Sequence, residues 1–183
     1  FDHKYLNELK TFCDEFKPTR VSDHLCWSST GGHFWHDLLP FPYTEENLNR
    51  LVAKVLFWQD KLKRPLVIEN LSAYITSSHN EMSEYAFLAA LVKKTTCQIL
   101  LDLNNMIVNA KNFKIDPYEE MKHINLDSVA QIHLAGHAPD EKTDKVMRQM
   151  LQGAIQMIIR SQQVPKSEAN RGGWRYQPSS SDS

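Results

Sequence analysis

Four short apolar runs in this sequence each end in residues that can bind a metal ion or move a proton. In chain order these residues are Asp23 with His24, Glu69 with Asn70, Asp102, and His133. The carboxyl ends of parallel strands meet at one edge of an α/β sheet, where ligands bind, so we expect these side chains to converge. A buried carboxylate is costly unless it is paired or bound to a metal. Clustered carboxylates and imidazoles without lysine or arginine therefore predict a divalent cation.

The donor atoms limit which metal this would be. They come from imidazole and carboxylate groups, with no thiolate obviously included. Mixed nitrogen and oxygen sets suit iron, manganese or zinc, and those with open positions are typical of non-haem iron. We expect iron, with zinc or manganese as the alternatives.

Strand geometry favours one residue of each pair. Successive side chains on a strand point to opposite faces, so Asp23 and His24 cannot both point to the site. We predict His24 as the ligand and Asp23 as its supporting partner, and we favour Glu69 over Asn70 in the same way. In HLAGH (133–137), the first histidine leaves the strand, and His137 lies in the loop over its end.

Composition excludes several other classes of protein. The 183 residues include 21 Lys+Arg and 22 Asp+Glu, without the basic excess expected of a nucleic-acid binder. No apolar stretch is long enough to span a membrane, and the segment FDHKYLNELK lacks the apolar core of a signal peptide, so we expect a cytoplasmic protein. Cys13, Cys26 and Cys97 are odd in number and widely spaced, as reduced thiols are.

The elements that position these residues alternate along the chain. Helical spacing of apolar residues and capping signals predict helices over 2–16 and 44–62, from 83, from 116, and over 146–158. Continuous apolar runs predict buried strands at 19–27, 65–70, 98–103 and 128–134, and the Gly- and Pro-rich segment 31–44 reads as a loop.

This alternation predicts an α/β fold with parallel strands in sequential order, buried on both faces. We assign 1–160 to this domain. The segment 161–183 loses all periodicity and is rich in Ser, Gln, Pro and Gly, so we predict an irregular or disordered tail.

Five motifs make the sequence familiar. They are VSDHLCWSSTGGHFWHDLLPFPYTEENL, LVIENLSAYI, EMSEYAFLAAL, ILLDLNNMIVNAKNF and IHLAGHAPD. Together and in this order, over about residues 1–140, they closely resemble the multinuclear non-haem iron-dependent oxidases, the family that includes the methanobactin-biosynthesis oxidase and many bacterial proteins.

The resemblance implies a TIM-type (β/α) barrel of the xylose-isomerase-like kind. It implies two or three iron ions and an O2-dependent oxidoreductase that modifies a ribosomally made peptide, often presented by a partner protein. By motif, His24, Glu69, Asp102 and His133 would bind the metals, with Glu69 as the bridging carboxylate. The resemblance also implies that His137 is a further ligand, and that Asp102 and His137 are the candidate catalytic residues. Asn104 and Asn105 would be supporting residues.

The family barrel has further strands before the first motif and further ligands after HLAGH, and neither is visible here. A complete (β/α)8 barrel needs at least about 200 residues. We therefore expect a barrel incomplete at both ends, which binds iron below the family stoichiometry and self-associates through unpaired edges.

Two other functions remain open. One is a metal-dependent isomerase or phosphodiesterase of the same barrel class, and the other is a truncated, non-catalytic remnant. Metal content would separate them: iron supports the oxidase, zinc, magnesium or manganese the second class, and no metal the remnant. Trp27, Trp35 and Tyr43 are candidates to hold a peptide, although aromatic residues near prolines usually pack a loop.

Overall fold

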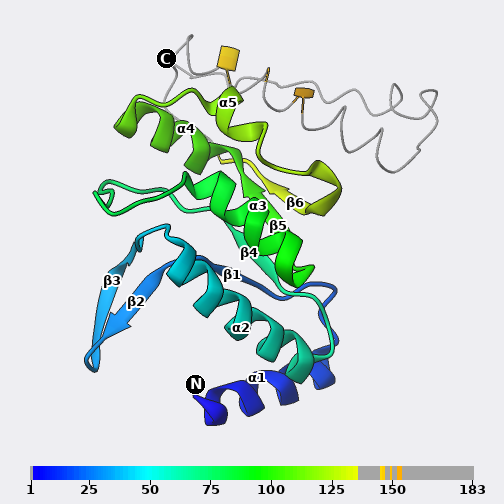
Figure 1. The fold of residues 1–183 in the computed structure, drawn as a ribbon. Coiled ribbons are helices and arrows are strands. Elements are labelled where there is room, and N and C mark those ends of the chain that lie inside the picture. The colour runs from blue at the N-terminus through cyan, green and yellow to red at the C-terminus, as the bar shows by residue number, and fades with distance from the viewer. Residues whose placement is uncertain (1, 136–144, 147–148, 150–151, 154–183) are drawn as a thin grey trace, which may run out of the picture.

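The structure is a computed structural model, and it describes residues 2–135, 145–146, 149 and 152–153. Helices alternate with the strands of a parallel sheet along the described chain (Figure 1). The α/β class predicted from the sequence is therefore confirmed. No helix among the described residues is long and apolar enough to cross a membrane.

The main sheet has four strands in the order β1-β4-β5-β6. These are β1 (Ser22–His24), β4 (Val67–Glu69), β5 (Gln98–Asp102) and β6 (Val129–His133). Every neighbouring pair is parallel, so the predicted sequential order is confirmed. The described strands form an open sheet with β1 and β6 at its edges, and they do not show the closure of a barrel.

The first strand is shorter and more exposed than predicted. The segment 19–27 was expected to be one buried strand, but β1 covers only Ser22–His24, and all its residues are exposed. The prediction was wrong because β1 pairs with β4 on one side only, at the edge of the described sheet. An apolar run such as 65–70 is buried on both faces only in a central strand.

The segment 31–44 is not the predicted loop. Its first part joins an antiparallel hairpin of β2 (Trp27–Thr30) and β3 (His33–Leu39). Gly31 and Gly32 form the turn, with φ of +56° and +81°. Two positive-φ residues between strands suit the tight turns of hairpins, so the two glycines mark a reversal of the chain here.

Three helices agree with the predictions. They are α1 (His3–Phe16), α2 (Glu45–Leu62) and α3 (Glu84–Thr95). In each case the residue before the helix is an N-cap whose side chain accepts a backbone N–H, as sequence patterns of this kind predict.

The helix α4 (Leu103–Phe113) was not predicted. It begins directly after β5, and Asp102 is both the last residue of the strand and the N-cap of the helix. Because no loop separates the two elements, the apolar run of the strand continues into the buried face of the helix. The expected helix from 116 is the short α5 (Pro117–Met121), which Asp116 caps, and the 3-10 helix η1 (Leu126–Ser128) leads into β6.

Four helices end in a residue with left-handed backbone conformation that is not glycine. These residues are Lys17, Lys63, Thr96 and Lys114, with φ between 47° and 57°. The left-handed conformation is the usual way to end a helix, but glycine is the residue that adopts it without steric cost.

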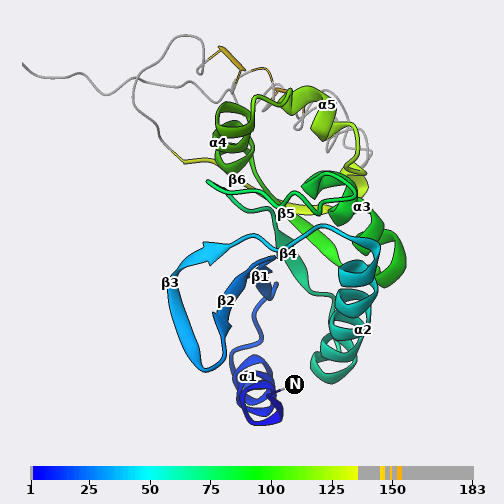
Figure 2. The same cartoon turned by 60° about the vertical axis from the view of Figure 1, so that its left-hand side comes forward.

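The core lies between the sheet and its helices. Ile68, Ile99 and Leu101 point from the central strands into one cluster with Leu48 of α2 and Leu88 of α3. Figure 2 shows α2 and α3 along the same side of the sheet, and the β2–β3 hairpin projecting near β1. The helices fix one face of the sheet, and the carboxyl ends of its strands remain available for a site.

Three predictions concern residues outside the described ones. They are the position of His137, most of the last helix (146–158), and the irregular tail (161–183). The cysteines Cys13, Cys26 and Cys97 are free, as predicted.

Candidate metal centre

The strand register places four of the predicted site residues on one face of the sheet. His24 pairs with Glu69, and Asp102 pairs with His133. Glu69 also pairs with Leu100, two residues before Asp102. Paired residues point to the same face and successive residues alternate, so His24, Glu69, Asp102 and His133 share the face opposite the helices.

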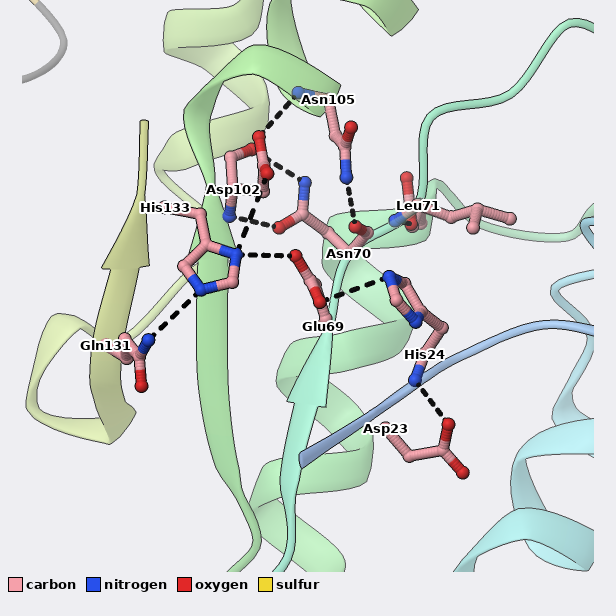
Figure 3. A network of polar contacts seen from close by, with 10 residues as sticks. Asp23, His24, Glu69, Asn70, Leu71, Asp102, Asn105, Gln131 and His133 are labelled. Atoms are coloured by element: carbon pink, nitrogen blue, oxygen red, sulfur yellow. Dashed lines mark hydrogen bonds and ion pairs between the residues drawn. The ribbon is translucent and has the colours of Figure 1, made fainter. Parts of the chain in front are cut away.

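The buried carboxylate of Glu69 lies between two imidazoles (Figure 3). Its Oε2 is 3.1 Å from His24 Nε2, and its Oε1 is 3.1 Å from His133 Nδ1. Glu69 is only 7% exposed. Each carboxylate oxygen therefore faces a different imidazole in a partly desolvated position, where electrostatic interactions are stronger than in water.

Asp102 completes a group that could hold a metal ion. Its Oδ2 lies 4.0 Å from His133 Nδ1, while its Oδ1 accepts the N–H of Asn105 at 2.9 Å. One ligand atom each from Glu69, Asp102 and His133 can be chosen such that all lie within 4.8 Å of one another. The other ring nitrogen of His133, Nε2, lies 3.0 Å from Gln131 Nε2.

The residues next to His24 and Glu69 have other contacts. Asp23 aligns with Ile68, on the helix side of the sheet, and its Oδ1 accepts the N–H of His24. The Asn70 amide joins the ends of β4 and β5, because its Oδ1 accepts the N–H of Asp102 at 2.7 Å and its Nδ2 donates to the Asp102 carbonyl at 3.0 Å. Both residues support the backbone of the site, and neither is part of the cluster.

Asn104 and Asn105, also predicted as supporting residues, hold backbone groups. Asn105 Nδ2 donates to the Asn70 carbonyl at 2.9 Å, and Asn104 Oδ1 accepts the N–H of Ala135 at 3.3 Å. Asn104 thus lies beside the backbone that follows β6. The ligand predicted from that loop, His137, lies outside the described residues.

A buried polar network behind the cluster was missed in the sequence. Glu84 Oε1 accepts the N–H of Leu71 at 2.7 Å, and Glu84 Oε2 accepts from Asn109 at 3.1 Å. Burial raises the pKa of the Glu84 carboxyl to about 7; the Leu71 N–H opposes this shift, and the carboxylate of Glu120 adds to it. The protonation state of the Glu84 carboxyl therefore changes near neutral pH.

The sequence offers only weak signals for this network. An acid such as Glu84 in the first turn of a helix is usually an exposed partner of the helix dipole, so its type and place do not reveal burial. Asn105, Asn109 and Asn112 recur at helical spacing, which would have indicated one polar face, but the helix α4 was itself missed.

A cavity of about 500 Å3 lies between the edge strand β1 and the helices α1 and α2, on the side of the sheet that carries Asp23 and Ile68, and His24 is among its lining residues. Its walls come from α1, β1, β2 and α2, and the lining residues include Cys26, Trp27 and Trp58. Of the aromatic residues considered for a peptide, Trp27 and Trp35 are exposed, whereas Tyr43 packs in the core with Phe41 and Phe87.

A parallel α/β sheet with imidazole and carboxylate groups gathered at the ends of its strands is a framework that could hold a metal ion. Over residues 1–165, the sequence matches the family described as RiPP precursor modification enzyme MbnB/TglH/ChrH. The chain belongs to this family of enzymes, which act on precursors of ribosomally made peptides.

Curated proteins from several bacteria are also similar to this chain. The UPF0276 protein of Caulobacter vibrioides is 48% identical over 134 residues, 73% of this chain and 48% of the relative. Those of Acaryochloris marina and Vibrio vulnificus are 44% identical over 133 residues and 42% identical over 161 residues, covering 73% and 88% of this chain. The chain spans about half the length of these curated relatives, 48% and 53% in the last two cases.

Proposed function

We propose that this chain contributes the metal-binding part of an iron-dependent oxidase that uses O2 to modify a ribosomally made peptide. Membership of a family of RiPP precursor modification enzymes supports a ribosomally made peptide as the substrate. The observation that favours a metal is the position of Glu69, a buried carboxylate with a different imidazole at each oxygen.

The residues present fit such a metal. The donors are nitrogen and oxygen atoms, a set that suits iron, zinc or manganese. Glu69 and Asp102 add two carboxylates to the cluster, and the groups that face Glu69 are imidazoles, which are charged only when protonated. A divalent cation would balance this charge.

In this proposal His24, Glu69, Asp102 and His133 hold the metal, and His137 is a further ligand. Iron bound by these residues would supply the redox chemistry with O2. Glu69 would bridge two ions, since its oxygens face separate imidazoles. Asp102 and His137 are the candidate residues at the reacting peptide, and Asn70 holds the ends of β4 and β5 together beneath the ligands.

The peptide would approach from the side of β1. The cavity of about 500 Å3 at β1 has His24 and Trp27 among its lining residues, and Trp27 adds an exposed aromatic surface of the kind that binds peptides. A partner protein that presents the peptide would fit beside it, because β3 exposes Phe34 and Trp35. In the full-length relatives, further strands would close the sheet into a xylose-isomerase-like barrel around this site.

Metal analysis of the anaerobically purified chain tests the proposal. We expect iron, with Mössbauer signals of coupled ferric ions after exposure to air. Zinc, magnesium or manganese in its place would favour a hydrolytic or isomerase activity of the same barrel class. A chain that takes up no metal would contradict the proposal and favour a non-catalytic remnant.

Glu69→Gln gives the residue-level test. We expect this variant to lose its iron and its peptide oxidation while it stays folded, because removing a buried negative charge does not cost stability in the metal-free protein. Glu46→Gln, an exposed glutamate of α2 paired with Arg50, is the matched control and should retain its iron. Full iron loading of Glu69→Gln would contradict the role of Glu69.

A further inference from the structure

The backbone directly after Glu69 is held by side chains where a neighbouring strand would otherwise bond it. We call Asn105, Asn109 and Asn112 the asparagine row, since they lie along one face of α4. Asn105 Nδ2 donates to the carbonyl of Asn70 at 2.9 Å, and Asn109 Nδ2 donates to that of Leu71 at 2.7 Å. The row thus follows the segment 70–73 from one residue to the next.

The row continues to the end of this segment. Asn109 Oδ1 accepts the N–H of Ala73 at 2.8 Å, and Asn112 Nδ2 donates to the carbonyl of Ala73 at 2.7 Å. Asn109 therefore binds the segment at two places. It is also the most deeply buried member of the row, at 3% exposed.

Glu84 binds the same segment from another helix. It accepts the N–H of Leu71 at 2.7 Å and an N–H of Asn109 at 3.1 Å. The backbone N–H and the carbonyl of Leu71 are therefore both hydrogen-bonded to side chains, the first to Glu84 of α3 and the second to Asn109 of α4. A buried polar network is rigid only when each of its groups has a hydrogen-bond partner. Glu84 and Asn109 bind each other as well as Leu71, so the loss of either would leave the other without one of its partners.

Glu84 and Asn109 both bind Leu71, which lies two residues after Glu69, the candidate bridging carboxylate. Glu69 is the last residue of β4, and its direction depends on the backbone on both sides. The sheet holds the preceding residues, Val67 and Ile68, by strand pairing. After Glu69, the segment 70–73 has these side-chain contacts in place of strand pairing. A change of about 1 Å in a ligand's position is enough to weaken a metal site.

We propose that Asn109 and Glu84 are positioning residues that fix the Glu69 carboxylate for metal binding. This inference rests on the metal site proposed above. It assigns a role in the site to two buried residues that contact no ligand themselves. Their contacts determine how the chain leaves β4, and so which way the Glu69 side chain points toward His24 and His133.

Cobalt(II) titration of the whole chain under anaerobic conditions tests this role, with visible absorption as the spectroscopic signature. We expect Asn109→Ala to bind cobalt about 10- to 100-fold more weakly, the range seen when groups that orient ligands are removed. Glu84→Gln keeps an acceptor for Leu71 but offers an N–H to Asn109, and should weaken binding about tenfold. Both should shift the cobalt absorption bands.

Asn112→Ala is the matched control. It removes the same group from the same face of α4, but at the far end of the segment and at an exposed position. We expect its cobalt affinity to stay within about threefold of the wild type, since substitutions at exposed positions usually have small effects. Circular dichroism fixes a temperature at which every variant is fully folded, so that a loss of stability alone does not change the affinity.

Metal-free protein provides a second readout. The ring-nitrogen NMR shifts of His133 report the contact of its Nδ1 with Glu69, and Asn109→Ala should change them while Asn112→Ala leaves them as in the wild type. If the wild type binds cobalt and Asn109→Ala and Glu84→Gln bind it equally well, the positioning role is wrong and the metal site stands. If the wild type binds no cobalt, the metal site fails, and unchanged His133 shifts in Asn109→Ala would then refute the positioning role as well.

If Asn109→Ala does not fold, Glu84→Gln provides the same test. It should fold because it keeps the size of the side chain and removes a charge that is costly to bury. Cobalt affinity and His133 shifts in this variant that match the wild type would overturn the proposal.

Discussion

The ends of β4 and β1 contribute facing residues to the same cluster, yet they differ in burial and in what holds the chain that follows them. All residues of β4 are buried, and the chain beyond Glu69 is hydrogen-bonded by buried side chains from two helices. All residues of β1 are exposed, and the chain beyond His24 enters the projecting hairpin. The His24 side chain is 39% exposed, against 9% for that of Glu69.

This difference separates two tasks of a binding site. In the proposed site, the buried end would fix the direction of the Glu69 carboxylate, because the backbone groups that follow it are paired with buried side chains. The exposed end borders the cavity that β1 lines together with α1 and α2, which leaves space for another molecule at this edge of the sheet. We therefore expect changes at the two ends to affect different quantities.

Stability should depend mainly on the buried end. Leu101 of β5 is fully buried, whereas Leu38 of β3 is 41% exposed. Leu101→Ala should lower the free energy of unfolding by about 2–5 kcal/mol, because it removes core contacts and leaves a cavity. Leu38→Ala removes the same atoms and should cost less than about 1 kcal/mol. Urea unfolding measures both, and equal losses would show that the hairpin is as tightly packed as the core.

The pH dependence of stability should come in part from Glu84. Its folded pKa of about 7 lies above its ordinary value of 4.5, so the folded state binds more protons than the unfolded state between these pH values. Its contribution to stability therefore decreases as the pH rises through this window. The free energy of unfolding of the wild type, relative to Glu84→Gln, should decrease by about 2–3 kcal/mol from about pH 5 to pH 8.

Other titratable groups near Glu84 do not account for this difference. Burial raises the pKa values of the Tyr43 and Tyr85 hydroxyls above their ordinary value, which already lies above this range. Neither tyrosine therefore loses its proton between about pH 5 and pH 8. Glu120, which faces Glu84 from α5, is present in both proteins, and Glu120→Gln should reduce the effect but not abolish it. A constant difference between wild type and Glu84→Gln across this range would show that Glu84 is ionised throughout.

The two imidazoles on Glu69 should differ in their effect on metal affinity. His24→Ala removes a ligand from the exposed edge strand, where water can replace it, and we expect about a tenfold loss of affinity. His133→Ala also removes the neighbour of Asp102, and its loss should be larger. Isothermal titration with cobalt(II) compares them. A larger loss for His24→Ala would mean that the exposed end, rather than the buried one, determines affinity.

Asp23 should have the smallest effect. Asp23→Asn keeps the oxygen that accepts the N–H of His24 and removes only a charge on the helix side of the sheet. We expect metal affinity and stability within about 0.5 kcal/mol of the wild type, as for most exposed positions. A loss of metal in this variant would show that Asp23 is a ligand.

Much of the fold could be predicted because periodic segments determine it. The α1, α2 and α3 helices have apolar stripes and capping residues, and the central strands are continuous apolar runs. The exposure of β1 could not be read from its residues, because edge and central positions depend on what pairs with the strand. The α4 helix was hidden because Asp102 ends a strand and caps a helix at once.

The cluster could be predicted in part for a similar reason. Parallel pairing brings strand ends together, so His24, Glu69, Asp102 and His133 were found from their places in the chain. Glu84 and Asn109 could not be found in this way. Their proposed role depends on burial against a segment distant in sequence. The spacing of Asn105, Asn109 and Asn112 is a weak signal, and it indicates one polar face only if α4 is known to be a helix.

The left-handed ends of four helices leave room to engineer this protein without touching its site. Lys17, Lys63, Thr96 and Lys114 adopt a conformation that costs a side-chain-bearing residue on the order of 1 kcal/mol relative to glycine. All four follow the carboxyl ends of helices, away from the residues that face Glu69. Glycine at these places offers a reserve of thermostability, which could offset the losses expected when the buried half of the cluster is redesigned for another metal or peptide.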